Sequence, residues 1–112
     1  MAAKSTEIQV VLCTCPPEHA DTLARALVSD RLVACVNVVP AVQSVYRWEG
    51  AVQSDTESLL IMKTRQGSLE ALIAAIESQH PYDVPEVLSL PIGGGSEAYL
   101  SWVLAETGTD TE

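Results

Sequence analysis

Residues 33–62 read VACVNVVPAVQSVYRWEGAVQSDTESLLIM and hold the signals that decide the fold. The stretch begins as a valine-rich strand, which Pro40 interrupts because proline cannot donate to a strand ladder. A bulge or a sheet edge is expected at that proline. The chain then stays extended to Trp48, turns at Glu49-Gly50, and returns as a strand that is polar in its first half and apolar in its second. The stretch therefore predicts one long β-hairpin.

A strand and a helix are expected before this hairpin. The run 8–14 is apolar and rich in β-branched residues, which favours a buried strand. Pro17 can open the helix, since the first helical turn does not need its missing N–H group. Apolar residues then recur at the spacing of one helical face, at Ala20, Leu23, Ala24 and Leu27.

A helix, a strand and a last helix are expected after the hairpin. A second helix is predicted to begin after Ser68, as its N-cap, and to end at His80-Pro81. A fourth strand over 86–90 follows, and Ser96 is placed to cap a last helix. The order β-α-β-β-α-β plus a C-terminal helix predicts an α+β chain of the ferredoxin-like, split βαβ type, with helices on one face of an antiparallel sheet.

Composition limits the class of protein. The 112 residues are 47% apolar and 19% charged, so we expect 1–112 to form a single globular domain. The net charge of −9 argues against a nucleic-acid partner. No apolar run reaches about 18 residues and the first residues are polar, so we expect no membrane span, no signal peptide and a cytoplasmic protein. The three cysteines are then expected to be free thiols.

The hairpin carries Tyr46 and Trp48 toward its tip at Glu49-Gly50. Two large rings on an extended arm cannot be buried within one small domain, and exposed apolar groups on a strand edge normally find a partner. We therefore expect Tyr46, Trp48, Glu49 and Gly50 to form an interface between protomers.

Several segments resemble the signature blocks of the CutA family, in the same order along the chain. The resemblance covers about residues 8–106, and these blocks are SVYRWEG at 44–50, Glu57 with Lys63-Thr64, HPYDVPE at 80–86, VLCT at 11–14, ACVN at 34–37 and YLSW at 99–102. The resemblance implies a ferredoxin-like protomer, a tight homotrimer made through the long hairpin, and a likeness in shape to PII signalling proteins.

The same resemblance implies a link to copper and other divalent cations, with Cys13 and His80 at positions that the family associates with copper. Some members have two consecutive histidines where this chain has Gln79-His80. An amide therefore replaces one strong donor.

The residues themselves leave alternatives open at these positions. Cys13 and Cys15 lie two apart on a strand, so both thiols face the same way and suit a soft metal ion, or else act as small buried hydrophobes. His80 is read equally as a metal ligand or as a cap at the end of its helix. Cys35 lies among Ala34, Val36 and Val38 and is expected in the core.

A second candidate site involves charged residues beside apolar ones. Glu57 and Lys63 share one face of the returning strand. They are read either as structural ion pairs or, with Tyr82 and Glu86, as a pocket between protomers for an ion or a small anion.

Two functions follow from these observations. The first is a trimeric, metal-responsive protein of divalent-cation tolerance that binds copper with modest affinity, with other divalent cations left open. The alternative is a PII-like trimeric signalling or scaffold module that binds a small molecule or protein in clefts between subunits. No Ser-His-Asp set, carboxylate dyad or complete Cys-His arrangement stands out, so we do not expect an enzyme.

Overall fold

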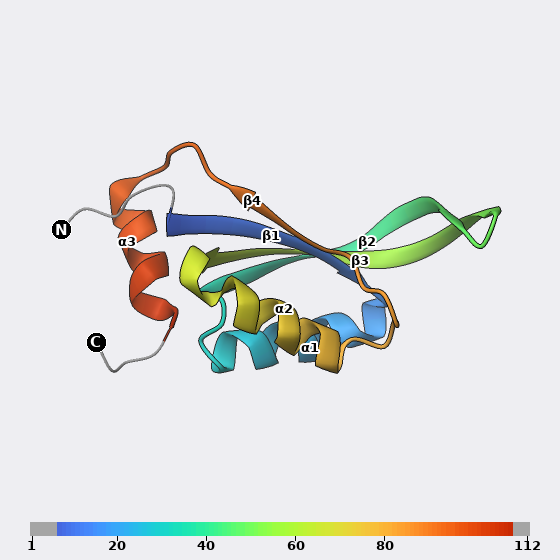
Figure 1. Ribbon diagram of the computed structural model, residues 1–112, viewed down its shortest axis with the longest axis horizontal. Helices are drawn as coiled ribbons and strands as arrows, with labels where there is room; N and C mark the ends of the chain where they lie inside the picture. The colour runs from blue at the N-terminus through green and yellow to red at the C-terminus, as the bar shows by residue number, and fades with distance from the viewer. Residues whose placement is uncertain (1–6, 109–112) are drawn as a thin grey trace.

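Four strands form one antiparallel sheet in the order β2-β3-β1-β4 (Figure 1). A computed structural model describes residues 7–108. Within those residues, helices α1, α2 and α3 and the 3₁₀ turn η2 accompany the sheet. The elements are β1 (Ile8–Cys15), α1 (Pro17–Ser29), β2 (Cys35–Trp48), β3 (Ala51–Arg65), η2 (Gln66–Ser68), α2 (Leu69–Gln79), β4 (Val87–Pro91) and α3 (Glu97–Glu106). This order confirms the predicted ferredoxin-like α+β fold with an added C-terminal helix.

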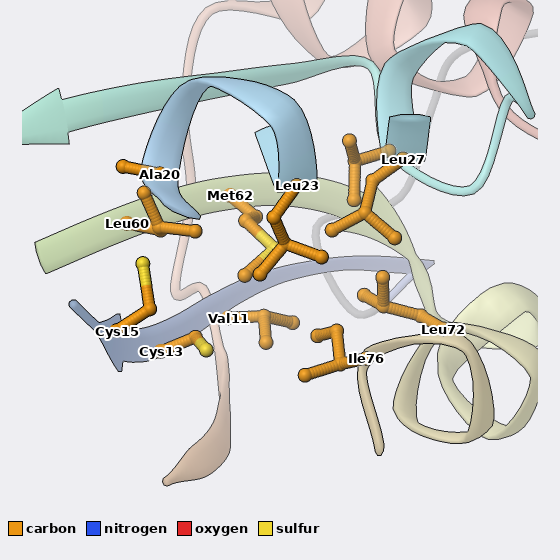
Figure 2. Packing of buried hydrophobic residues seen from close by; sticks show 11 residues of the cluster. Val11, Cys13, Cys15, Ala20, Leu23, Leu27, Leu60, Met62, Leu72 and Ile76 are labelled. Atoms are coloured by element: carbon orange, nitrogen blue, oxygen red, sulfur yellow. The ribbon is translucent and has the colours of Figure 1, made fainter. Parts of the chain in front are cut away.

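Helices α1 and α2 cover one face of the sheet (Figure 1). Alternate residues of β1 and β3 point toward them, and Figure 2 shows Val11, Leu60 and Met62 packed against Leu23 and other apolar residues of the two helices. The main core therefore lies between the sheet and these two helices.

The opposite face, which we call the open face, carries the other alternate residues. On it Leu12 is in register with Ile61 of β3 and Leu88 of β4. Leu88 is 56% exposed and Leu90 is 48% exposed. A protomer by itself thus leaves large apolar side chains of its sheet in water.

The hairpin of β2 and β3 runs well past the helices, and we call residues 42–57 the arm (Figure 1). The register shifts between Val39 and Val42, which confirms the bulge expected at Pro40. At the tip, Glu49 has φ 50° and Gly50 has φ 80°. Positive φ at both central residues is the signature of a type I′ turn, whose twist matches that of a two-stranded hairpin. The molecule consequently measures 50 × 26 × 22 Å.

The helix ends follow the sequence signals with one exception. Pro17 is at the start of α1, and the Ser96 hydroxyl accepts a hydrogen bond from the Tyr99 amide at the start of α3. Ser68 occupies the N-cap position of α2, but its side chain makes no capping bond. It belongs instead to the preceding 3₁₀ turn, with a helical φ of −96° and ψ of −5°.

Helix α3 packs at the end of the sheet opposite the arm (Figure 1). A second apolar cluster forms there from Ile8, Ala34, Leu100 and Val103. Cys35 lies beside it, with its Sγ 3.5 Å from the Tyr99 hydroxyl, and is only partly buried. The expectation that Cys35 belongs to the core was wrong, because strand alternation places it in register with Lys63 on the open face.

Candidate functional site

The segment 80–86 crosses from the end of α2 to the start of β4, and His80 holds it against the sheet. The ring Nε2 lies 2.7 Å from the carbonyl oxygen of Thr14, at the end of β1. The ring Nδ1 accepts a hydrogen bond from the Tyr82 amide at 3.1 Å. Only the neutral tautomer with its proton on Nε2 satisfies both contacts.

His80 therefore acts as a bridge between β1 and the chain that follows α2. Its side chain is 8% exposed, and its ring packs against that of Tyr82 at 4.7 Å between centroids. The imidazole contacts none of the α2 carbonyl groups through a side-chain hydrogen bond; only its backbone amide bonds to Ile76. His80 is the C-cap residue of α2, as one of the two readings from sequence expected, but the bridge made by its ring was not among them.

Tyr82 joins the same segment to the arm. Its hydroxyl donates a 2.9 Å hydrogen bond to Oε2 of Glu57 on β3. Burial raises the pKa of the Tyr82 phenol, and the bond to Glu57 and the charge of that carboxylate raise it further. The hydroxyl therefore keeps its proton and remains a donor at neutral pH.

A cleft of about 740 Å³ opens between the base of the arm and the segment 80–86, and we call it the arm cleft. Its floor includes Thr14 of β1. The remaining lining residues come from the arm and the crossing segment: Gln43, Ser44, Val45, Tyr46, Trp48, Glu57, Tyr82, Asp83, Val84 and Glu86. The cleft thus combines three carboxylates with three aromatic side chains.

Strand alternation explains why these arm residues gather. Ser44 is in register with Asp55, and Val42 with Glu57, so Ser44, Tyr46 and Glu57 share one face of the hairpin. The Tyr46 hydroxyl bonds to the carboxylate of Asp55, and this bond raises the pKa of the phenol. The arm therefore presents polar and aromatic groups to one side of the cleft.

The structure brings together three of the four residues predicted for a pocket. Glu57, Tyr82 and Glu86 all line the arm cleft. Lys63 does not, since it lies further along β3, in register with Cys35, and its Nζ donates to the side chain of Asn37. A role for Lys63 in a cleft shared between protomers stays a prediction.

Sequence reasoning missed Thr14, Asp83 and Tyr46 as members of this site. The period-two pattern of the arm was a signal for Tyr46, because it places that ring on the same face as Glu57. The contact between the arm and the segment 80–86 has no such local signal.

Cys13 and Cys15 do face the same way, as expected, but toward the helices. Both are buried in the main core, as Figure 2 shows. Burial raises the pKa of the Cys13 thiol to about 12, with smaller contributions from Cys15, Glu86 and Glu57. Burial likewise raises the pKa of Cys15. Both thiols are therefore held in the protonated form, which is a poor metal ligand.

The groups around Cys13 and His80 are not preorganised to hold a copper ion. Both ring nitrogens of His80 are hydrogen-bonded within the protein, and Gln79 beside it is exposed. Within residues 7–108, no three His, Cys, Asp or Glu side chains converge as a metal site would require.

The predicted interface residues all lie on the arm. Trp48 is 50% exposed and Tyr46 is 41% exposed, and Glu49 and Gly50 form the turn at its tip. Their positions leave them accessible to a second chain.

The helices of the described residues include none with the length and apolarity needed to cross a membrane.

Comparison with known proteins gives one family throughout. The family model for the CutA1 divalent ion tolerance protein matches residues 9–106. Among curated proteins, the chain is 50% identical over 107 residues to the protein CutA, chloroplastic, of Arabidopsis thaliana, covering 95% of this chain and 59% of that protein. It is 48% identical over 101 residues to the divalent-cation tolerance protein CutA of Thermus thermophilus, covering 89% and 98% respectively. The chain thus spans somewhat more than half of the plant relative and nearly all of the bacterial one.

Solved structures agree with this comparison. The crystal structure of CutA1 from Oryza sativa is 48% identical and superposes with a TM-score of 0.89, covering 94% of this chain and 98% of that one. The PII-like protein CutA from a Nostoc species, in its apo form, is 36% identical and has a TM-score of 0.85, covering 89% and 99%.

Proposed function

The chain belongs to the CutA1 divalent ion tolerance family, and on that premise we propose that it works as a homotrimer that binds its ligand in the arm clefts. The proposed role is binding rather than catalysis, in the manner of a PII-like module that responds to a cation. The observation that carries this proposal is the arm cleft itself, where a largely buried carboxylate, Glu57, lines a cavity beside the extended arm.

The exposed apolar surface supports assembly. Val45 and Val52 on the arm are 66% and 67% exposed, and Leu88 and Leu90 lie uncovered on the open face. Large apolar side chains exposed to water are unfavourable, and a cluster of them is typical of a protein interface. The resemblance to the CutA family supplies the number of protomers, three.

Binding rather than catalysis is supported by the state of the reactive groups. The buried thiols of Cys13 and Cys15 have raised pKa values, and His80 uses both ring nitrogens to hold the fold. None of these three is arranged as a nucleophile or a general base.

We propose that the chain binds copper with modest affinity. Ligation by Cys13 and His80 has to break the imidazole contacts with Thr14 and Tyr82 and to deprotonate a thiol whose pKa is about 12. Those costs reduce the affinity of Cys13 and His80 for any metal ion, although a thiolate and a released imidazole are good ligands.

A cytoplasmic location is part of the proposal. All three cysteines are free, which suits a reducing compartment.

The experiment that tests this function is thermal unfolding at several protein concentrations, with and without divalent cations. An obligate trimer should melt at a higher temperature as its concentration rises, and a cation that binds the folded trimer should raise the midpoint further. A midpoint independent of both concentration and added cations would contradict the proposal.

A further inference from the structure

The arm cleft has a marked charge asymmetry. Glu57, Asp83 and Glu86 line it, and its lining includes no lysine, arginine or histidine. The whole chain is acidic as well, with 15 acidic and 6 basic residues. The cleft therefore attracts cations and repels anions.

Glu57 is the most buried of the three carboxylates that line the arm cleft. Its side chain belongs to a residue only 6% exposed, and Oε2 accepts the hydrogen bond from Tyr82. Within the described part of the chain, the ion pair is Asp21 with Arg25, on α1, and Glu57 has no basic partner. Buried acidic side chains in proteins are normally paired.

The second oxygen of Glu57 is available to a ligand. Over residues 7–108, every fully buried side-chain oxygen or nitrogen has a hydrogen-bond partner. Oε1 accepts no hydrogen bond from those residues, so it keeps some contact with solvent, and Glu57 lines the arm cleft. One oxygen is thus fixed by Tyr82 while the other points outward.

The shape of the cleft favours an organic cation over a metal ion. A metal ion needs three or more ligands converging within about 2.0–2.6 Å, and the described acidic, cysteine and histidine side chains form no such group. A volume of about 740 Å³ is instead in the range that holds a small organic molecule.

The aromatic lining favours the same class of ligand. Tyr46, Trp48 and Tyr82 surround the cleft, and their ring faces attract a positive charge while their edges and faces pack against an apolar body. A metal ion with its shell of water molecules gains little from such a lining.

We propose that the arm cleft binds a small organic cation, an amine or amidine with an aromatic or aliphatic body. Its charged nitrogen donates to Oε1 of Glu57, and its body packs against Tyr82. This inference rests on the proposed function, because it names the ligand class of the same cleft. Asp83 and Glu86 add to the attraction from the rim.

The test uses the full chain in its assembled form and calorimetric titration with benzamidine, which carries a cation on a flat apolar ring. Benzamide, its neutral analogue, and benzoate, its anionic analogue, are the ligand controls. Benzamidine should bind at least about tenfold more tightly than benzamide, as a charge-assisted hydrogen bond predicts. Benzoate should not bind.

Substitutions of single carboxylates identify the residue that binds the charged nitrogen of benzamidine. Glu57→Gln should weaken the binding of benzamidine about tenfold or more, because the amide keeps an oxygen for Tyr82 and loses the charge. Glu86→Gln, at an exposed position of the rim that is safe for folding, should weaken it by a smaller factor. Glu106→Gln is the matched control, since it removes one exposed carboxylate from the end of α3, far from the arm, and should leave the affinity unchanged.

The remaining outcomes overturn the inference in distinguishable ways. Equal binding of benzamidine and benzamide, or an unchanged affinity in both Glu57→Gln and Glu86→Gln, excludes charge recognition in the cleft. Competition by a divalent metal salt, with stronger metal than benzamidine binding, makes the cleft a metal site and leaves the proposed function standing. A monomeric wild-type protein that binds none of the probes contradicts the proposed function as well.

Discussion

The Nε2 atom of His80 lies 2.7 Å from the carbonyl oxygen of Thr14, which ties the chain after α2 to the end of β1. The opposite ring nitrogen accepts the Tyr82 amide, and the Tyr82 hydroxyl in turn reaches Glu57. One imidazole thus positions the segment that forms a wall of the arm cleft. His80, which the sequence left open as a metal ligand or a helix cap, holds this segment in place.

His80→Ala should reduce the free energy of unfolding by about 1–3 kcal/mol, because it leaves a backbone carbonyl and a backbone amide without their partner. His80→Gln should lose less, since its amide nitrogen can replace the donor to Thr14 while the acceptor for Tyr82 is lost. Urea denaturation of both variants measures the difference. Equal stability of wild type and His80→Ala would show that the bridge contributes nothing.

The pKa of Cys13 predicts a loss of stability in alkaline solution. The thiol ionises near 9.0 when unfolded but only at about 12 when folded, so above pH 9 the unfolded state releases a proton that the folded state retains. The free energy of unfolding should therefore fall as pH rises from 9 toward 12, by up to about 1.4 kcal/mol per pH unit from this group. Below pH 9 the same group should have no effect.

Urea denaturation at pH 8, 9 and 10 measures this slope. Cys13→Ala should be less stable at pH 8 because of the cavity, and its stability should fall less steeply with pH than that of the wild type. Parallel slopes for the two proteins would contradict the assigned pKa.

All three cysteines should be free thiols. Alkylation of the denatured protein without reductant, followed by mass spectrometry, should modify Cys13, Cys15 and Cys35, in agreement with the structure. In the native protein Cys13 and Cys15 should react slowly, because they are buried and protonated. A disulfide among them would contradict both the structure and the cytoplasmic proposal.

Copper uptake should be modest, with Cu(I) retained better than Cu(II), and should weaken as pH falls because the ligands must lose their protons. Cys13→Ser and His80→Ala should each reduce anaerobic uptake, and Gln79→His should increase it by adding an imidazole at an exposed position. Cys35→Ser is the matched thiol control. Unchanged uptake in both Cys13→Ser and His80→Ala would place any copper elsewhere.

Local signals explain why the arm was predictable. Pro40 marks the bulge and Glu49-Gly50 the turn, and each acts through its own backbone conformation. The same holds for Pro17 and Ser96 at helix starts. Such features depend on neighbours in sequence, so the ferredoxin-like order and the family were both correctly predicted.

The candidate site depended on contacts between distant segments, and there prediction was incomplete. Nothing in the sequence near His80 shows that its ring would contact Thr14, which lies in another strand. Glu57 and Lys63 share a strand face, yet only Glu57 reaches the segment 80–86, because that segment crosses at one end of the strand. The predicted metal and pocket roles of these residues stay predictions.

Assembly of the protein through the arm is tested most directly by sedimentation velocity of the wild type and of Trp48→Ala. The wild type should sediment as a single species with the mass of three chains at micromolar concentration, without a monomer peak. Trp48→Ala should sediment more slowly and melt at a lower temperature, since it removes a large, half-exposed ring from the arm. Glu106→Gln, at the opposite end of the molecule, should sediment like the wild type. A wild-type monomer that keeps its full stability on dilution would contradict the central claim.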